Sequence, residues 1–157
     1  MSSSEPQIEP GAVSIREYQP QDFPRLCVLD RICFAPGIAY SPEEIAAAFG
    51  QARTFCLVAA DQDEVIGFVL THYRRAVGHI ITIDIHPDYR GHGIGSRLME
   101  MSERRLAELG IHRVVLEVAV SNQPAIAFYG GRGYLQQRLL PHYYRDHSDA
   151  FLMEKAL

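Results

Sequence analysis

Three glycines at alternate positions separate an apolar run from an amphipathic segment, and this junction constrains the chain more than any other feature. The run from His79 to Ile85 has the composition of a buried strand, and the segment from Ile94 to Leu109 has helical periodicity. Gly91, Gly93 and Gly95 leave the intervening turn without Cβ atoms that would block a ligand. The unpaired N–H groups of a helix's first turn also carry the positive end of its dipole. The turn is therefore predicted to hold a phosphate group.

Two common phosphate-binding motifs do not fit this turn. A P-loop requires Lys-Ser or Lys-Thr after its last glycine, whereas Gly95 is followed by Ser-Arg. A dinucleotide-binding fingerprint requires two residues between its second and third glycines, whereas Ile94 alone separates Gly93 from Gly95. The spacing that does fit the turn is Arg-x-x-Gly-x-Gly, with Arg90 as its first residue.

Length and composition indicate one globular domain, since the chain has 157 residues, 47% of them hydrophobic. We expect this domain to span residues 12–157, after a disordered tail at 1–11 that is rich in Ser, Glu and Pro. The balance of 15 basic and 19 acidic residues, a net charge of −4, argues against a nucleic-acid partner bound through a broad basic surface. The sequence has no apolar run that could cross a bilayer and no signal-like leader, so we expect no membrane partner.

The cysteines and histidines predict neither a disulfide framework nor a metal site. Cys27, Cys33 and Cys56 are odd in number and form no CxxC pair, so we interpret them as buried apolar side chains in a reducing cytoplasm. The seven histidines form no His-x-x-x-His pair and no tight His/Cys cluster, which predicts that no metal is bound. His79, in the strand before the glycine turn, could approach a site there, but a surface position is the favoured interpretation.

Periodicity and turn residues predict an α/β fold with a mixed sheet and helices on both of its faces. The expected strands are 13–17, 54–60, 65–73, 77–85, 113–120, 133–140 and 150–157. The expected helices are 20–34, one that starts at Ser41-Pro42, 94–109 and 123–129. The buried face predicted for the third helix consists of Ile94, Leu98, Met101, Leu106 and Leu109. Its predicted solvent face consists of Arg97, Glu100, Glu103, Arg104 and Glu108, and Gly110 is expected to cap its C-terminus.

Three motifs occur in order in the second half of the chain. Arg-x-x-Gly-x-Gly begins at Arg90, Leu-Glu-Val-Ala-Val-Ser-Asn occupies 116–122, and Ala-Ile-Ala-Phe-Tyr at 125–129 precedes Gly133-Tyr134. In this order they resemble the GNAT N-acetyltransferase superfamily, and within it the RimI-type enzymes that acetylate the N-terminal α-amine of ribosomal and other proteins. The similarity extends from about Ile15 to the C-terminus. It implies a GNAT-like, mixed and mostly antiparallel central sheet of about seven strands with helices on both faces.

The resemblance implies acetyl-CoA as co-substrate, with its pyrophosphate at the glycine turn and its pantetheine arm along the preceding strand. Cofactor contacts are implied for Ile83, Asp84, Ile85, Arg90, Gly91, His92, Gly93, Ile94, Gly95 and Asn122. Asp84 departs from the small or apolar residue common at this position, and either faces the amine substrate or is solvated. Asn122 is also suited to cap the helix that follows it.

Two residues match the catalytic positions of the family. Glu117 matches the general base, which acts through a water, and an α-amine that titrates near pH ~8 needs only modest help from a base. The alternative for Glu117 is a solvent-facing position at a strand edge. Tyr129 matches the tyrosine that protonates the departing CoA thiolate, and its alternative is a core aromatic. Gly130-Gly131 follow Tyr129 where helix formers are usual, and each is expected to weaken that helix by ~1 kcal/mol.

The implied acceptor is the N-terminal α-amine of a protein or peptide, contacted by Tyr40, Tyr143 and Tyr144 from two loops. Tyrosine offers a rigid apolar ring and a hydroxyl that can bind a peptide carbonyl. One alternative is a small amine such as a polyamine, an amino acid or an antibiotic, which Asp146 and Asp149 could bind. The other is a non-catalytic acyl-CoA-binding module, which would need neither catalytic residue. The sequence leaves open whether the protein is a monomer or a homodimer.

Overall fold

The computed structural model describes residues 12–157 as one seven-stranded sheet with helices packed on it, and the predicted tail at 1–11 lies outside the described residues. The strands are β1 (Val13–Glu17), β2 (Thr54–Asp61), β3 (Glu64–Arg74), β4 (Val77–Ile85), β5 (Arg113–Ala119), β6 (Leu135–Leu140) and β7 (Ala150–Ala156). The helices are α1 (Phe23–Cys33), α2 (Pro42–Gly50), α3 (Ile94–Glu108) and α4 (Gln123–Gly131), with single 3-10 turns η1 (Pro20–Asp22) and η2 (Pro87–Tyr89). Within the described range no helix is long and apolar enough to cross a bilayer.

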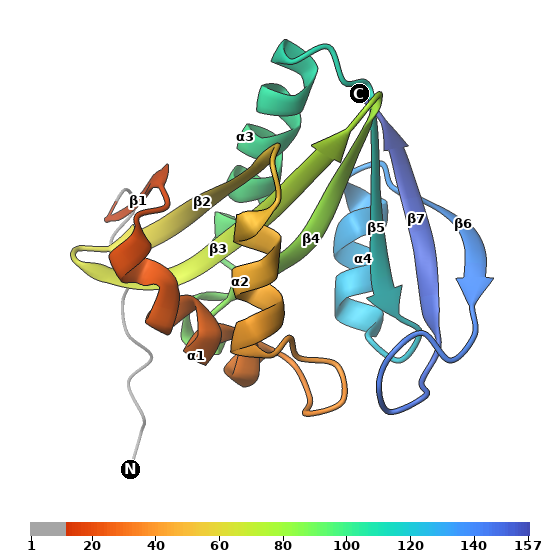
Figure 1. Cartoon of the computed structure of the whole chain (residues 1–157), viewed down its shortest axis with the longest axis horizontal. Coiled ribbons are helices and arrows are strands. Elements are labelled where there is room, and N and C mark those ends of the chain that lie inside the picture. The colour runs from red at the N-terminus through yellow and green to blue at the C-terminus, as the bar shows by residue number, and fades with distance from the viewer. Residues whose placement is uncertain (1–11) are drawn as a thin grey trace.

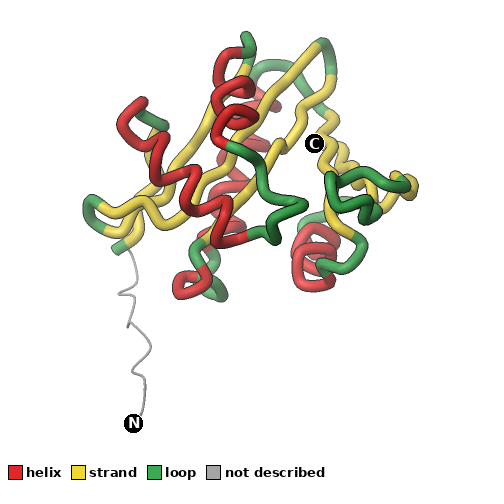
Figure 2. Tube along the Cα trace, turned by 60° about the horizontal axis from the view of Figure 1, so that its bottom comes forward, coloured by secondary structure: helices red, strands yellow, loops and turns green. Residues whose placement is uncertain are grey.

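The strand order is β1-β2-β3-β4-β5-β7-β6, and every neighbouring pair is antiparallel except β4–β5. Helices α1 and α2 cover one face, and α3 and α4 cover the other (Figures 1 and 2). The α/β class, the mixed and mostly antiparallel sheet of seven strands, and the helices on both faces are confirmed.

The parallel pair β4–β5 is short, and this shapes the site. Residues 77–79 of β4 pair with residues 113–115 of β5, and beyond them the two strands diverge (Figure 1). The edge of β4 that faces β5 therefore lacks a neighbouring strand over its second half. Two strands that part in this way leave backbone groups free to pair with something other than the sheet.

A β-bulge in β4 sets which of its side chains face which layer. Leu70 of β3 pairs with Thr82 and the next residue pairs with Ile80, so Ile81 is the extra residue. Ile80 and Ile83 consequently both pack against the α3 side of the sheet, although they are three positions apart. Thr82 and Asp84 face α1 instead.

The local signals for helix ends predicted their positions well. Ser41 Oγ accepts from Glu44 N at 3.1 Å and Glu44 Oε1 accepts from Ser41 N at 3.0 Å, a capping box that starts α2. Gly110 has φ +81° just after α3, as expected for a C-terminal glycine. The first predicted helix is partly wrong, since residues 20–22 form a 3-10 turn and the α-helix begins at Phe23.

The predicted buried face of α3 is wrong at both of its margins. Met101 and Leu109 are 40% and 49% exposed, whereas Met99 is fully buried. Glu103, predicted to face solvent, is 7% exposed. Its carboxylate is paired, which offsets the cost of burying the charge. The paired groups are Arg132 NH2 at 2.8 Å, Tyr134 OH at 2.9 Å and Lys155 Nζ at 3.1 Å.

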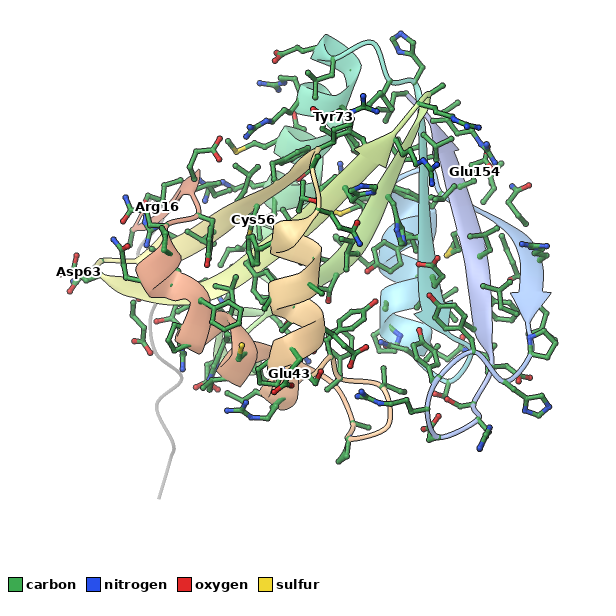
Figure 3. The ribbon with its side chains drawn as sticks, in the orientation of Figure 1. Arg16, Glu43, Cys56, Asp63, Tyr73 and Glu154 are labelled. Carbon is green, nitrogen blue, oxygen red and sulfur yellow. The ribbon has the colours of Figure 1, made fainter. Side chains whose placement is uncertain are left out.

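The cysteines are free thiols, as their spacing predicted. Cys27 and Cys56 are buried, and Cys56 lies on β2 in a second apolar cluster with residues of α1 (Figure 3). Cys33 is only partly buried, and its Sγ lies 3.4 Å from the Ile85 carbonyl oxygen. The prediction of buried apolar side chains therefore fits two of the three.

Helix α4 continues through Gly130 and Gly131, two residues beyond its predicted end at Tyr129. A Cβ at either glycine would meet no atom within 4 Å, and neither has positive φ. We expect Gly130→Ala and Gly131→Ala each to raise the free energy of unfolding by about 0.5–1 kcal/mol in urea titrations, because alanine restricts the unfolded chain. Gly133→Ala is the matched control and should destabilise, since Gly133 has φ +94°. Destabilisation by all three changes would contradict the prediction.

Candidate functional site

The glycine turn has the backbone conformation expected of an anion-binding loop. Gly91 and Gly93 have φ +80° and +78°, in the left-handed region that other residues rarely adopt, although a Cβ at either would meet no atom within 4 Å. Gly95 has a different role, since its Cβ would lie 3.4 Å from Phe128 of α4. The first helical hydrogen bond of α3 runs from Arg97 N to Gly93 O, so the preceding N–H groups of the turn point outward without helical partners.

The turn is tied to the end of the strand before it. Arg90 Nε donates to the Ile85 carbonyl at 2.9 Å, so the guanidinium lies across the end of β4 and keeps a positive charge beside the turn. Arg97, one turn into α3, donates to the Val13 carbonyl of β1 at 3.1 Å. The two arginines thus anchor the helix start on the sheet.

The open edge of β4 presents the backbone of Ile83. His86 N–H donates to a carbonyl of β3 at 2.8 Å, whereas the carbonyls of Ile81 and Ile85 accept hydrogen bonds from side chains outside the sheet. Because backbone groups alternate in direction along a strand, Ile83 faces the same open edge and Asp84 faces β3. Of the three strand residues with implied cofactor contacts, Ile83 is therefore the one with its main chain available where the strands diverge.

Asp84 is not solvated, which corrects one of the two sequence-based expectations for it. Its side chain is 1% exposed and accepts from Thr82 Oγ1 at 2.7 Å. Burial raises the pKa of Asp84 well above its ordinary range, and the nearby charge of Asp30 raises it further. Asp30 of α1 was not singled out by sequence reasoning, because an acidic residue in an amphipathic helix ordinarily faces solvent.

A histidine and a glutamate meet where β4 and β5 part. His79 Nε2 lies 2.7 Å from Glu117 Oε2, with side chains 33% and 17% exposed. His79 thus approaches the candidate site, one of the two expectations stated for it, while its side chain remains partly exposed. Glu117 does not simply point to solvent from a strand edge, because the His79 imidazole orients its carboxylate. Sequence reasoning missed this pair because the residues are 38 positions apart and their contact depends on the strand register.

The three predicted acceptor tyrosines converge on this pair. Burial, followed by the charge and hydrogen bonding of Glu117, raises the pKa of Tyr143 to about 12. Burial also raises the pKa of Tyr40 and of Tyr144, and Tyr143 and Glu117 are the main neighbours that add to both shifts. The rings of Tyr143 and Tyr144 meet edge to face with centroids 4.9 Å apart. All three phenols are thus protonated at neutral pH and lie within electrostatic range of the same carboxylate.

The two tyrosine-bearing loops also touch each other. Arg145 donates to the Glu44 side chain and to the Ala39 carbonyl, which joins the β6–β7 loop to the α1–α2 loop. A Cβ built on Gly37 would lie 2.5 Å from the Asp146 Cβ, so the loops are in direct contact there. Sequence reasoning missed the roles of Arg145 and Gly37, since nothing local to either loop indicates the other.

Asp146 and Asp149 are already engaged within their own loop. Asp146 Oδ1 accepts from Ser148 N at 2.9 Å, and Asp149 Oδ1 accepts from His142 N at 2.9 Å. These hydrogen bonds hold both carboxylates within the loop.

Tyr129 lies in the apolar core beside the site. Its side chain is 9% exposed and packs between Phe128 and Tyr134, with ring centroids 5.4 and 5.9 Å away. Burial raises the pKa of Tyr129, so its phenol is protonated at neutral pH. Asn122 Oδ1 accepts from Ala125 N at 3.3 Å and caps α4, the helix that carries Tyr129.

Comparison with known proteins gives a family match and close relatives. The acetyltransferase (GNAT) family matches residues 14–134. An uncharacterized N-acetyltransferase of Methanocaldococcus jannaschii is 33% identical over 143 residues, 90% of this chain and 90% of that protein. An N-alpha-acetyltransferase of Sulfurisphaera tokodaii is 41% identical over 81 residues, 51% of this chain and 48% of that protein.

The fold agrees with a solved acetyltransferase. The crystal structure of a ribosomal-protein alanine N-acetyltransferase from Escherichia coli matches with a TM-score of 0.82 and 24% identity, over 92% of this chain and 93% of that one. The family match, the full-length relative and the shared fold therefore agree with the three sequence motifs: the chain belongs to the GNAT acetyltransferase family and is an N-acetyltransferase.

Proposed function

We propose that this protein transfers the acetyl group of acetyl-CoA to the N-terminal α-amine of a protein or peptide. The observation that carries the proposal is the convergence of Tyr40, Tyr143 and Tyr144 on the His79–Glu117 pair. The Glu117 carboxylate thus has phenol groups near it that can hydrogen-bond the main chain of a peptide. The relative from Sulfurisphaera tokodaii bears the name N-alpha-acetyltransferase, which supports the same acceptor.

Acetyl-CoA fits the groups that the glycine turn and β4 present. The outward N–H groups after Gly93, together with the helix dipole, suit a pyrophosphate. The main chain of Ile83 on the open edge of β4 suits an amide-containing arm laid along the strand. A backbone N–H there can also polarise the thioester carbonyl, because charge develops on that oxygen during attack.

The reaction needs two proton transfers, and the site has a group for each. The amine nitrogen forms a bond to the thioester carbon, and its proton passes through a water to Glu117, whose carboxylate is oriented by His79. The C–S bond then breaks, and the Tyr129 phenol donates its proton to the CoA thiolate. Because burial keeps the Tyr129 phenol protonated at neutral pH, it holds the proton that the departing thiolate takes up.

The acceptor class is tested with peptides of one sequence that differ only at the N-terminus. We expect acetylation of a peptide with a free α-amine and none of the same peptide with a blocked N-terminus, measured by mass spectrometry of the products. Lysine and spermidine serve as small-amine arms and should be acetylated poorly, because Asp146 and Asp149 are engaged within their loop. Turnover of the small amines without turnover of the free peptide would overturn the proposed acceptor.

A further inference from the structure

Two carboxyl groups lie buried together between α1 and β4. Asp30 of α1 and Asp84 of β4 are 0% and 1% exposed. Among residues 12–157 neither carboxyl makes an ion pair with a lysine, arginine or histidine within 4 Å. Two ionised carboxylates at this depth would repel each other and would lack compensation for lost hydration. At least one of them must therefore be neutral.

The hydrogen bonds show where a proton belongs. Asp30 Oδ2 accepts from Tyr40 N at 2.6 Å, and Asp84 Oδ1 accepts from Thr82 Oγ1 at 2.7 Å. The other oxygen of each carboxyl, Asp30 Oδ1 and Asp84 Oδ2, is buried without a donor among the described residues. The two carboxyls are neighbours, since each shifts the pKa of the other through a side-chain hydrogen bond. One proton between them satisfies both remaining oxygens at once.

The surroundings identify Asp84 as the protonated member. Burial raises the pKa of both groups, and the charge of Asp30 raises that of Asp84 further. Hydrogen bonds from Asp84, Tyr40 N–H and Thr82 act in the opposite direction on Asp30 and favour its anion. The other titratable or charged groups that act on the pair, or on which it acts, are Cys27, Cys33, Tyr40, Glu44, Cys56, Arg90 and Tyr129.

We propose that Asp84 donates a hydrogen bond to the Asp30 carboxylate, and that this shared-proton pair is a positioning device that holds Tyr40 in the acceptor side of the site. The inference rests on the proposed function, since it assigns Tyr40 to the acceptor. Asp30 holds the Tyr40 backbone through a short, charge-assisted bond, and Asp84 holds Asp30 on β4. The α1–α2 loop is thereby fixed to the strand that carries the open edge.

The Asp30–Asp84 pair is expected to affect binding of the acceptor peptide and not binding of acetyl-CoA. The Tyr40 hydroxyl also approaches the Ile81 carbonyl on β4. The side chain of Tyr40 therefore contacts β4 directly, and its backbone is linked to β4 through Asp30 and Asp84. The glycine turn is held by Arg90 on Ile85 and does not depend on the α1–α2 loop. Loss of the pair should therefore weaken binding of the peptide while leaving binding of acetyl-CoA intact.

Kinetics of Asp30→Ala test this split. We expect its KM for the acceptor peptide to rise about tenfold or more, because a charged hydrogen bond to Tyr40 is lost, while KM for acetyl-CoA stays within about twofold. Asp22→Ala is the matched control: Asp22 is 7% exposed, and at the opposite end of α1 it accepts hydrogen bonds from Arg16, which Figure 3 labels, and from Gln19 N. It should lower thermal stability without a selective change in peptide KM. Equal changes in both KM values for Asp30→Ala would overturn the proposal.

Asp84 variants test the proton itself. Asp84→Asn keeps a donor to Asp30 and should retain a peptide KM near that of the parent protein, whereas Asp84→Ala should raise it as Asp30→Ala does. At about pH 8, where ordinary carboxyls are ionised, the infrared spectrum should show the band of one protonated carboxyl group, and Asp84→Asn should lose that band. A spectrum without the band, or a band that survives in Asp84→Asn, would rule out the shared proton. The infrared result needs no turnover, so it decides the pair even if peptides prove not to be acetylated.

Discussion

Glu117→Gln is expected to lower kcat by about 10²–10⁴-fold, because the amide cannot accept the proton that the attacking amine must lose. The substitution keeps the shape of the side chain and its hydrogen bond to His79, so the fold and the acetyl-CoA site should be unchanged. KM for acetyl-CoA should therefore change little in steady-state kinetics under conditions where the chemical step limits the rate. Tyr129→Phe should act in the same way by removing the proton donor for the thiolate.

Glu154→Gln provides the matched control on the neighbouring strand. Glu154 lies on β7, is 26% exposed at its side chain and is paired with Arg113 (Figure 3). Its loss removes an ion pair of the sheet surface, where such pairs contribute little to stability, and should leave kcat unchanged. If Glu117→Gln retained the kcat of Glu154→Gln, Glu117 would be a structural partner of His79 rather than the base.

Features determined by neighbours in sequence could be predicted. The start of α2 at Ser41-Pro42, the glycine that ends α3, and the glycine turn before α3 depend on residues at most a few positions apart. The three motifs in order indicated the family, because each is made by one continuous segment. The fold followed from seven strand patterns and the order of the helices between them.

Features determined by distant parts of the chain could not be predicted. The sequence pattern predicts Glu103 as a surface residue of an amphipathic helix. Ion pairs with Arg132 and Lys155, which come from later segments, offset the free-energy cost of burying its charge. Asp84 likewise reads as exposed in a strand, whereas the bulge at Ile81 and the partner on α1 place it in the interior.

The His79–Glu117 pair illustrates the same limit. Glu117 could be singled out because it matches the glutamate of the family motif and is a polar residue within an apolar strand. The sequence placed His79 near the site only as the less favoured alternative, since its contact with Glu117 exists only because β4 and β5 run parallel for three residue pairs and then diverge. The motif thus predicted one member of the pair, and the sheet topology supplied the other.

Gly93→Val is expected to abolish detectable binding of acetyl-CoA in calorimetry. Gly93 has φ +78°, so valine would force the turn into another conformation, at a cost of about 1–3 kcal/mol if it stayed. If the turn moves, the N–H groups at the start of α3 no longer converge on one point, and if it stays, a branched side chain stands beside them. Gly110→Val is the matched control, because Gly110 has φ +81°, open surroundings and a place at the far end of the same helix. Equal loss of stability in both variants, with loss of acetyl-CoA binding only in Gly93→Val, would assign the effect to the turn. Unchanged affinity in Gly93→Val would place the pyrophosphate elsewhere.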